Sequence, residues 1–143
     1  MIMTNTVANR DIVITDADFD RLTRLAESSP LRRTHHAFLR SLKDELDRGK
    51  VVSSTDVPPA VVTMNSKIVV RDTRTRETET WTLVYPEEAD LDEGKLSVLA
   101  PLGTALLGAA MGQVVKFEAP AGLRRLKIEK ILYQPEAAGD FHL

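Results

Sequence analysis

The stretch LSVLAPLGTALLGAAMGQVVKFEAPAG, from Leu96 to Gly122, decides the fold of this chain. It reads as a short strand, an apolar helix that begins at Pro101, a second strand and a tight Pro-Ala-Gly turn. Proline suits the first position of a helix because its missing N–H has no partner to lose there. Gly112 is predicted to end the helix, and Gly108 inside it predicts close packing, since glycine there costs about 1 kcal/mol relative to alanine. The apolar side of the helix consists of Leu102, Ala105, Leu106 and Ala109.

Alternating apolar residues on both sides of this stretch predict a sheet. Ile68 and Val70 alternate with polar neighbours, and Leu126 and Ile128 repeat the pattern further along the chain. The polar segment DTRTRET, residues 72–78, is predicted to connect two of the strands as a hairpin. The strands and the helix together predict the α+β class. A further strand is predicted from the shared face of Trp81, Leu83 and Tyr85.

The N-terminal third predicts two amphipathic helices that form a short antiparallel hairpin, or coiled coil. Thr15 is a suitable N-cap for the first helix, with Asp18 placed to reach back as in a capping box. Pro30 breaks the pattern, and a second helix is predicted over residues 33–48. The predicted organisation is a hairpin over residues 1–50, a linker over 51–60 and a C-terminal domain over 61–143.

Composition narrows the function classes. The chain has 143 residues, of which 43% are hydrophobic, so a packed core is expected. It has no cysteine, no secretion signal and no long apolar run, which predicts a cytoplasmic protein without a membrane span. The formal net charge of −2 argues against bulk nucleic-acid binding. Counted by halves, residues 1–50 carry +1 and residues 51–143 carry −3, so DNA contact is expected to be at most indirect.

No catalytic, cofactor or metal site is predicted. The adjacent His35 and His36 would point about 100° apart on a helix and do not chelate together as i, i+4 pairs do. The chain has neither a nucleophile with a base beside it nor a glycine-rich phosphate loop. The sequence YQPEAAGD, residues 133–140, predicts an extended segment in which Glu136 and Asp140 are solvated acids.

The order of elements between Leu96 and Gly122 resembles the C-terminal domain of the Gre transcript-cleavage factors. The segments VVTMNS (residues 61–66), TLVYP (82–86) and YQPEAAGD narrow the resemblance to the Rnk family of nucleoside diphosphate kinase regulators. This resemblance implies an FKBP-like C-terminal domain, in which an antiparallel sheet is wrapped on one helix. It also implies that this domain binds RNA polymerase at the secondary-channel entrance, on the β′ subunit. It implies docking through Ala100, Pro101 and Leu102, although the alternatives are that Leu102 is a core residue and Pro101 only a helix starter.

The resemblance does not carry over the cleavage activity. Gre factors place two carboxylates at the hairpin tip to help hold a second Mg²⁺, whereas the tip here holds Arg32 and Arg33, with only Glu27 at its edge. The family therefore implies a non-enzymatic elongation regulator that competes with Gre factors and affects nucleoside diphosphate kinase indirectly. The alternative is an FKBP-like peptidyl-prolyl isomerase, whose aromatic pocket would be drawn from Trp81, Tyr85, Phe117, Tyr133 and Phe141.

Overall fold

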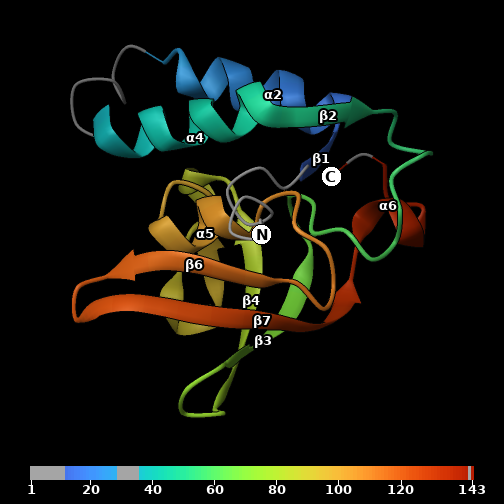
Figure 1. Ribbon diagram of the computed structural model, residues 1–143. Helices are drawn as coiled ribbons and strands as arrows, with labels where there is room; N and C mark the ends of the chain where they lie inside the picture. Colours follow the sequence, from blue (N-terminus) through green and yellow to red (C-terminus); the bar gives the residue numbers. More distant parts are fainter. Residues whose placement is uncertain (1–11, 29–35, 142) are drawn as a thin grey trace, which may run out of the picture.

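The structure, a computed structural model, describes residues 12–28, 36–141 and 143 (Figure 1). A helical hairpin lies along one side of a curled sheet, and a short helix packs against the sheet between the two (Figure 1). The mixture of helices with a mainly antiparallel sheet confirms the predicted α+β class. Within the described ranges, no helix is long and apolar enough to cross a membrane.

The hairpin consists of α2 (Asp16–Ala26) and α4 (His36–Arg48), which lie side by side (Figure 1). Thr15 caps α2 as predicted, because its hydroxyl accepts a hydrogen bond from the N–H of Asp18 at 3.1 Å. Each helix buries its apolar stripe, which includes Leu22 on α2 and Leu42 on α4. The predicted positions 33–35 of the second helix lie outside the described residues.

Two short strands at the base of the hairpin pair with each other, and the sequence patterns did not predict them. β1 (Ile12–Thr15) and β2 (Gly49–Val52) run parallel, with Ile12 opposite Gly49. Parallel strands need a long crossover connection, and the hairpin supplies it here. Val51 and Val52, which the sequence placed in the linker, therefore belong to β2.

The main sheet has five strands in the order β5-β4-β3-β7-β6. The predicted polar hairpin connection joins β3 to β4, and the Pro-Ala-Gly turn joins β6 to β7. All pairs are antiparallel except β4 with β5, which run parallel. The strands span β3 (Lys67–Asp72), β4 (Thr78–Val84), β5 (Lys95–Ser97), β6 (Val114–Ala119) and β7 (Gly122–Tyr133). Two 3-10 turns, η1 (Pro86–Glu88) and η2 (Leu91–Glu93), connect β4 to β5.

The helix that begins at Pro101 is shorter than predicted. α5 (Pro101–Leu106) ends before Gly108, which takes a left-handed conformation with φ of +76°. The prediction of a helix reaching Gly112, with Gly108 inside it, was therefore wrong. A Cβ on residue 108 would lie 2.7 Å from Cβ of Ile12, so this glycine allows close approach to β1 as well as the positive φ.

The sequence predicted an extended C-terminal segment. The structure instead has the short helix α6 (Pro135–Ala138) there. The side chain of Gln134 caps this helix by accepting from the N–H of Ala137 at 3.1 Å. Glu136 accepts a hydrogen bond from the hydroxyl of Thr63 at 2.7 Å, and Asp140 accepts one from Tyr133. The latter bond raises the pKa of Tyr133 to about 12. The two acids therefore hold α6 in place instead of being solvated.

One continuous hydrophobic core joins the hairpin to the C-terminal part. Ile12, Leu22 and Leu42 from the N-terminal part belong to the same buried cluster as Leu106 and Ile128 from the C-terminal part. The N–H of Val13 also donates to the carbonyl of Gly108 at 3.2 Å. The surface around α5 is therefore built together with the hairpin.

Candidate functional site

The three predicted docking residues differ in exposure. Pro101 is exposed at the first position of α5, and Ala100 is half-buried just before it. The side chain of Leu102 is only 6% exposed and belongs to the hydrophobic core. The core alternative for Leu102 therefore matches the structure, and Ala100 and Pro101 remain as residues that a partner can reach.

The turn that presents Pro101 is held by short contacts to its own backbone. The hydroxyl of Thr104 donates to the carbonyl of Val98 at 2.6 Å. Gly103 approaches the carbonyl of Ser97 so closely that a Cβ would lie 2.1 Å from that oxygen. No side chain fits at Gly103, and the hydroxyl of Thr104 ties the helix start to Val98. These two residues therefore determine where Pro101 lies.

Pro101 lines a groove of about 440 Å³ between the hairpin and the C-terminal part. Exposed polar residues of α4, including Ser41 and Asp44, form one wall. Lys116 and Glu118 of the edge strand β6 form the other. The groove offers a mixed polar and apolar surface, which suits a protein partner better than a small charged ligand.

The hairpin tip is only partly described. Glu27 is the exposed C-cap of α2, as expected for a residue at the edge of the tip. Arg32 and Arg33 lie outside the described residues, as does the rest of the segment from Ser29 to His35. Among residues 12–28, 36–141 and 143, no three His, Asp or Glu side chains are grouped to hold a metal ion.

Asp18 is the polar residue whose place the sequence patterns missed. Its carboxylate lies beside the N-cap Thr15, as the sequence predicted, but it is also buried, at 3% exposure, where α2 meets the C-terminal part. It accepts hydrogen bonds from the N–H of Met64 at 3.1 Å and from the hydroxyl of Tyr85 at 3.4 Å. Loss of hydration by burial raises the pKa of Asp18 to about 6, against the lowering effect of the Met64 bond.

Charged and aromatic neighbours surround Asp18. The guanidinium of Arg21 lies 4.1 Å from the ring centre of Tyr85 and donates to the carbonyl of Leu143 at 3.1 Å. The carboxylate of Glu136 on α6 is close enough to raise the pKa of Asp18 further. The hairpin, β4 and the C-terminal segment therefore meet at one polar junction, which gives YQPEAAGD a structural role.

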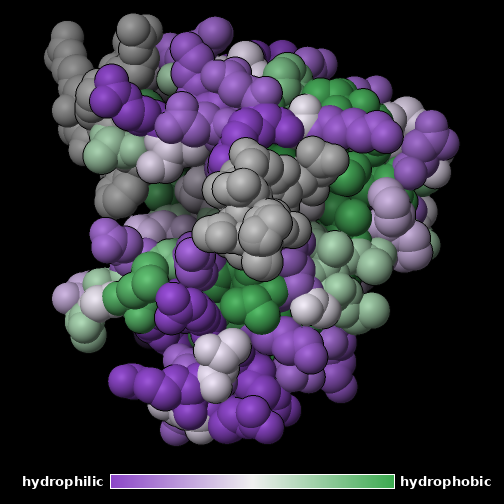
Figure 2. Space-filling view, in the orientation of Figure 1, coloured by the Kyte–Doolittle hydropathy of each residue, from purple (hydrophilic) through white to green (hydrophobic). Residues whose placement is uncertain are grey.

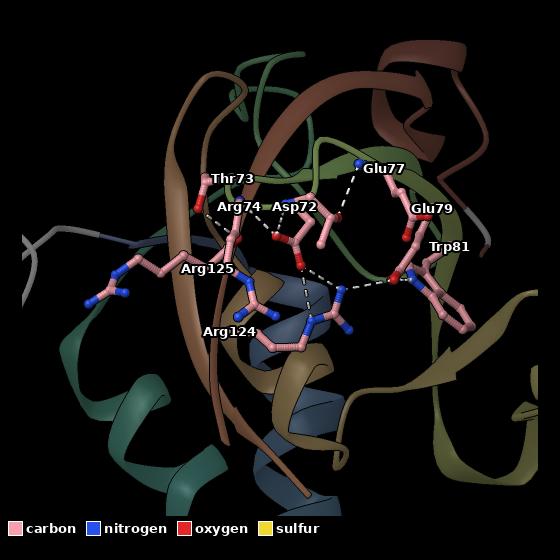
Figure 3. A network of polar contacts seen from close by, with 9 residues as sticks. Asp72, Thr73, Arg74, Glu77, Glu79, Trp81, Arg124 and Arg125 are labelled. Atoms are coloured by element: carbon pink, nitrogen blue, oxygen red, sulfur yellow. Dashed lines mark hydrogen bonds and ion pairs between the residues drawn. The ribbon is translucent and has the colours of Figure 1, made fainter. Parts of the chain in front are cut away.

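A second polar network lies at the opposite end of the sheet (Figure 3). Arg124 of β7 bridges two acids, Asp72 of β3 at 3.2 Å and Glu79 of β4 at 3.0 Å. Hydrogen bonds from the backbone N–H groups of Thr75 and Arg74, with help from Arg124, hold the pKa of Asp72 below its usual range. Since it cross-links three strands through partnered groups, this network stabilises the sheet.

The aromatic residues considered for an isomerase pocket are distributed over several places, with Trp81 and Phe117 both at the Arg124 network. The indole N–H of Trp81 donates to Glu79 at 2.9 Å, and the guanidinium of Arg124 lies 5.6 Å from the ring centre of Phe117. Tyr85 contacts the Asp18 junction, while Tyr133 holds Asp140. Phe141 is 51% exposed. These contacts leave the five rings without a shared lining for a proline substrate.

Comparison with known proteins gives two adjacent family matches. Residues 10–52 match the family described as Rnk N-terminus, and residues 57–133 match the family described as Transcription elongation factor, GreA/GreB, C-term. Over 133 residues the chain is 39% identical to the Regulator of nucleoside diphosphate kinase of Escherichia coli strain K12, covering 92% of this chain and 96% of that protein. The chain belongs to the Rnk family.

Other relatives connect this Rnk-family chain to the elongation factors. It is 34% identical over 92 residues to the transcription elongation factor GreA of Amoebophilus asiaticus, of whose length it spans 59%. A solved structure described as prokaryotic transcription elongation factor GreA/GreB from Nitrosomonas europaea has a TM-score of 0.71 and 38% identity. The match covers 85% of this chain and 99% of the chain in that structure. The predicted family and fold are thereby confirmed, and the relatives are named as regulators or elongation factors.

Proposed function

We propose that this Rnk-family protein binds RNA polymerase and regulates transcription elongation without being an enzyme itself. The observation that carries the proposal is the rigid presentation of Pro101 at the surface of a Gre-type C-terminal domain. The proposed docking surface is Ala100 and Pro101 together with the adjoining groove, and the proposed partner region is the β′ subunit at the secondary-channel entrance. Such a partner places the protein in the cytoplasm.

The proposal includes competition with Gre factors without stimulation of transcript cleavage. Between Ser28 and His36 the sequence has no Asp or Glu, so the tip lacks the anionic oxygens that a second Mg²⁺ requires. Each described hairpin helix is also short, with 11 residues in α2 and 13 in α4. A protein that fills the same entrance without these acids would suppress Gre action by mass action. Any effect on nucleoside diphosphate kinase would then follow from altered transcription.

Docking is tested by immobilising the full chain and measuring retention of purified RNA polymerase. Pro101→Asp should weaken retention at least tenfold, because it places a charge in the middle of the proposed contact while leaving the core untouched. Pro59→Asp is the matched control, since Pro59 is an exposed proline of the segment between β2 and β3 and does not line the groove. Equal retention of the two variants, with native circular dichroism, would rule out this docking surface.

Competition is tested by titrating the protein into a Gre-stimulated cleavage reaction on backtracked elongation complexes. Cleavage should decline with added protein and recover when more Gre factor is added. With the protein alone, the RNA should shorten no faster than it does by the polymerase's own slow cleavage. Inhibition that persists at saturating Gre factor would contradict a shared site, and RNA shortening by the protein alone would contradict the inferred loss of cleavage.

A further inference from the structure

The outward face of the main sheet gathers positive charge in a chain that is acidic overall. Strand pairing places six cations and two carboxylates of β3, β6 and β7 on this face, and these side chains sum to a formal charge of +4. Since the whole chain has a net charge of −2, the remainder carries −6. We call this surface the basic sheet face; its cations are Lys67, Arg71, Lys116, Arg125, Lys127 and Lys130, and its acids are Glu118 and Glu129.

The register places like charges directly opposite each other across the strands. Arg71 of β3 pairs with Lys127 of β7, and Lys116 of β6 pairs with Arg125 of β7. Like charges in facing positions destabilise a sheet. Glu129 forms an ion pair with Arg71 at 2.9 Å and offsets part of one repulsion. The facing cations therefore oppose sheet stability, which points to another use for them.

Protection of the sheet edge explains only a small part of this arrangement. Lysine on an edge strand discourages pairing with another chain, and Lys116 on β6 fits that role. Arg71 and Lys127 lie on β3 and β7, which are paired on both sides. Their cations do not guard an edge, so a different explanation is needed for the centre of the face.

The cations are accessible. Lys67, Lys127 and Lys130 are exposed, and Arg71 is half-buried. The side chain of Arg125 extends away from the Arg124 network (Figure 3). The surface over the turn between β3 and β4 is covered mainly by hydrophilic residues (Figure 2). A partner can therefore approach this face without rearrangement of the sheet.

We propose that the basic sheet face binds the phosphate backbone of double-stranded nucleic acid without sequence preference. Lysine, arginine and threonine are among the side chains that donate hydrogen bonds to phosphate oxygens. The outward residues of β4 next to the cations are Thr78, Thr80 and Thr82, with Thr78 facing Arg71 across the strands. Successive outward cations, such as Arg125 and Lys127, repeat about every 7 Å along a strand, so several can meet one backbone together.

The apolar residues on this face distinguish a duplex from other partners. Val114, Leu123 and Leu132 are exposed, but each lies at or next to the end of β6 or β7. The centre of the face holds mainly cations, with the half-buried Val69 between Lys67 and Arg71, whereas a protein interface is depleted of charge at its core. Single strands are held chiefly by stacking of bases on aromatic rings. Among the described outward residues of β3, β4, β6 and β7, the aromatic one is Tyr133, which lies at the end of β7 opposite Lys67 and is hydrogen-bonded to Asp140.

The net charges of the two halves of the sequence did not indicate the basic sheet face. The six cations come from three strands that are separated along the chain, and acids on inward or turn positions between them cancel their sum. The expectation that DNA contact is at most indirect rested on those net charges. The inference does not rest on polymerase docking, because duplex binding is measured in the absence of polymerase.

The test measures fluorescence anisotropy of a labelled 20-base-pair duplex of mixed sequence with the full chain at 50 mM salt. Binding should weaken as salt is raised. If four cations each meet a phosphate, affinity should fall on the order of 100-fold between 50 and 200 mM salt. Duplexes of unrelated sequence should bind equally, and a single strand of the same length should bind more weakly.

The decisive comparison uses two double variants with the same change in net charge. Arg125→Glu with Lys127→Glu reverses two cations of the face and should reduce duplex affinity at least tenfold, with a salt slope smaller by about 1.8. Arg40→Glu with Lys43→Glu reverses two exposed cations of α4 and should change affinity less than threefold. Thermal unfolding confirms that both variants are folded.

Three outcomes would overturn the proposal. One is no binding of the duplex to the unmodified chain at 50 mM salt. Another is an equal loss of affinity in the two double variants, which would show only an effect of net charge. The third is unchanged duplex binding in Arg125→Glu with Lys127→Glu accompanied by reduced polymerase retention, which would assign the face to an acidic protein surface.

Discussion

Replacement of Gly108 by alanine tests the contact that joins the N-terminal strand to the C-terminal part. Gly108 has a φ of +76° and lies against β1, to which its carbonyl is hydrogen-bonded. An added Cβ would lie 2.7 Å from Cβ of Ile12 and 3.1 Å from the backbone N and O of Val13. Those atoms belong to a buried strand and cannot move aside as the end of a long side chain does.

Two energetic effects add in this variant. The left-handed conformation costs alanine roughly 1–2 kcal/mol relative to glycine. Overpacking against a buried strand costs a further ~1–3 kcal/mol. We therefore expect Gly108→Ala to lower the free energy of unfolding by about 2–5 kcal/mol, which corresponds to a melting temperature lower by ~10 °C.

Gly112→Ala is the matched control because Gly112 also has a positive φ, +91°, but a Cβ there would meet nothing within 4 Å. The control should lose only the conformational part, about 1–2 kcal/mol. Urea unfolding followed by circular dichroism measures both variants. Equal losses for the two would refute the reasoning, because they would show that β1 does not press against Gly108.

Two further predictions concern the Asp18 junction and the turn that holds Pro101. The folded-state pKa of Asp18 is about 6 against an ordinary value of 3.8, so the folded state binds the proton more tightly and stability is lost as pH rises from about 4 to 6. Asp18→Asn should remove this loss, on the order of 3 kcal/mol, and flatten the pH dependence of urea unfolding in that window; an unchanged slope would contradict the buried position. Gly103→Ala should push the carbonyl of Ser97 away, weakening polymerase retention several-fold while far-ultraviolet circular dichroism stays native. Retention equal to that of the unmodified chain would show that the turn does not determine docking.

The sequence alone determined the local elements and the family. Helical spacing around Leu22 and Leu42 and alternation around Ile68 and Ile128 identified the hairpin and the main strands, because burying one side of an element imposes its period on the residues. Pro101 marked the start of α5 for a similarly local reason. The family resemblance, which also comes from the sequence, indicated Ala100 and Pro101 as candidate docking residues before the fold was known.

Only the tertiary structure decided how distant segments meet. The pairing of β1 with β2, the φ of Gly108 and the burial of Asp18 each depend on residues far along the chain. A glycine near a helix end or an aspartate near an N-cap has an adequate local explanation, which concealed these roles. The same holds for the basic sheet face, since the charge of a surface is the sum over strands that the fold brings together. Periodicity records which side of an element is buried, whereas partner, register and electrostatic environment arise from contacts between segments that no local pattern encodes.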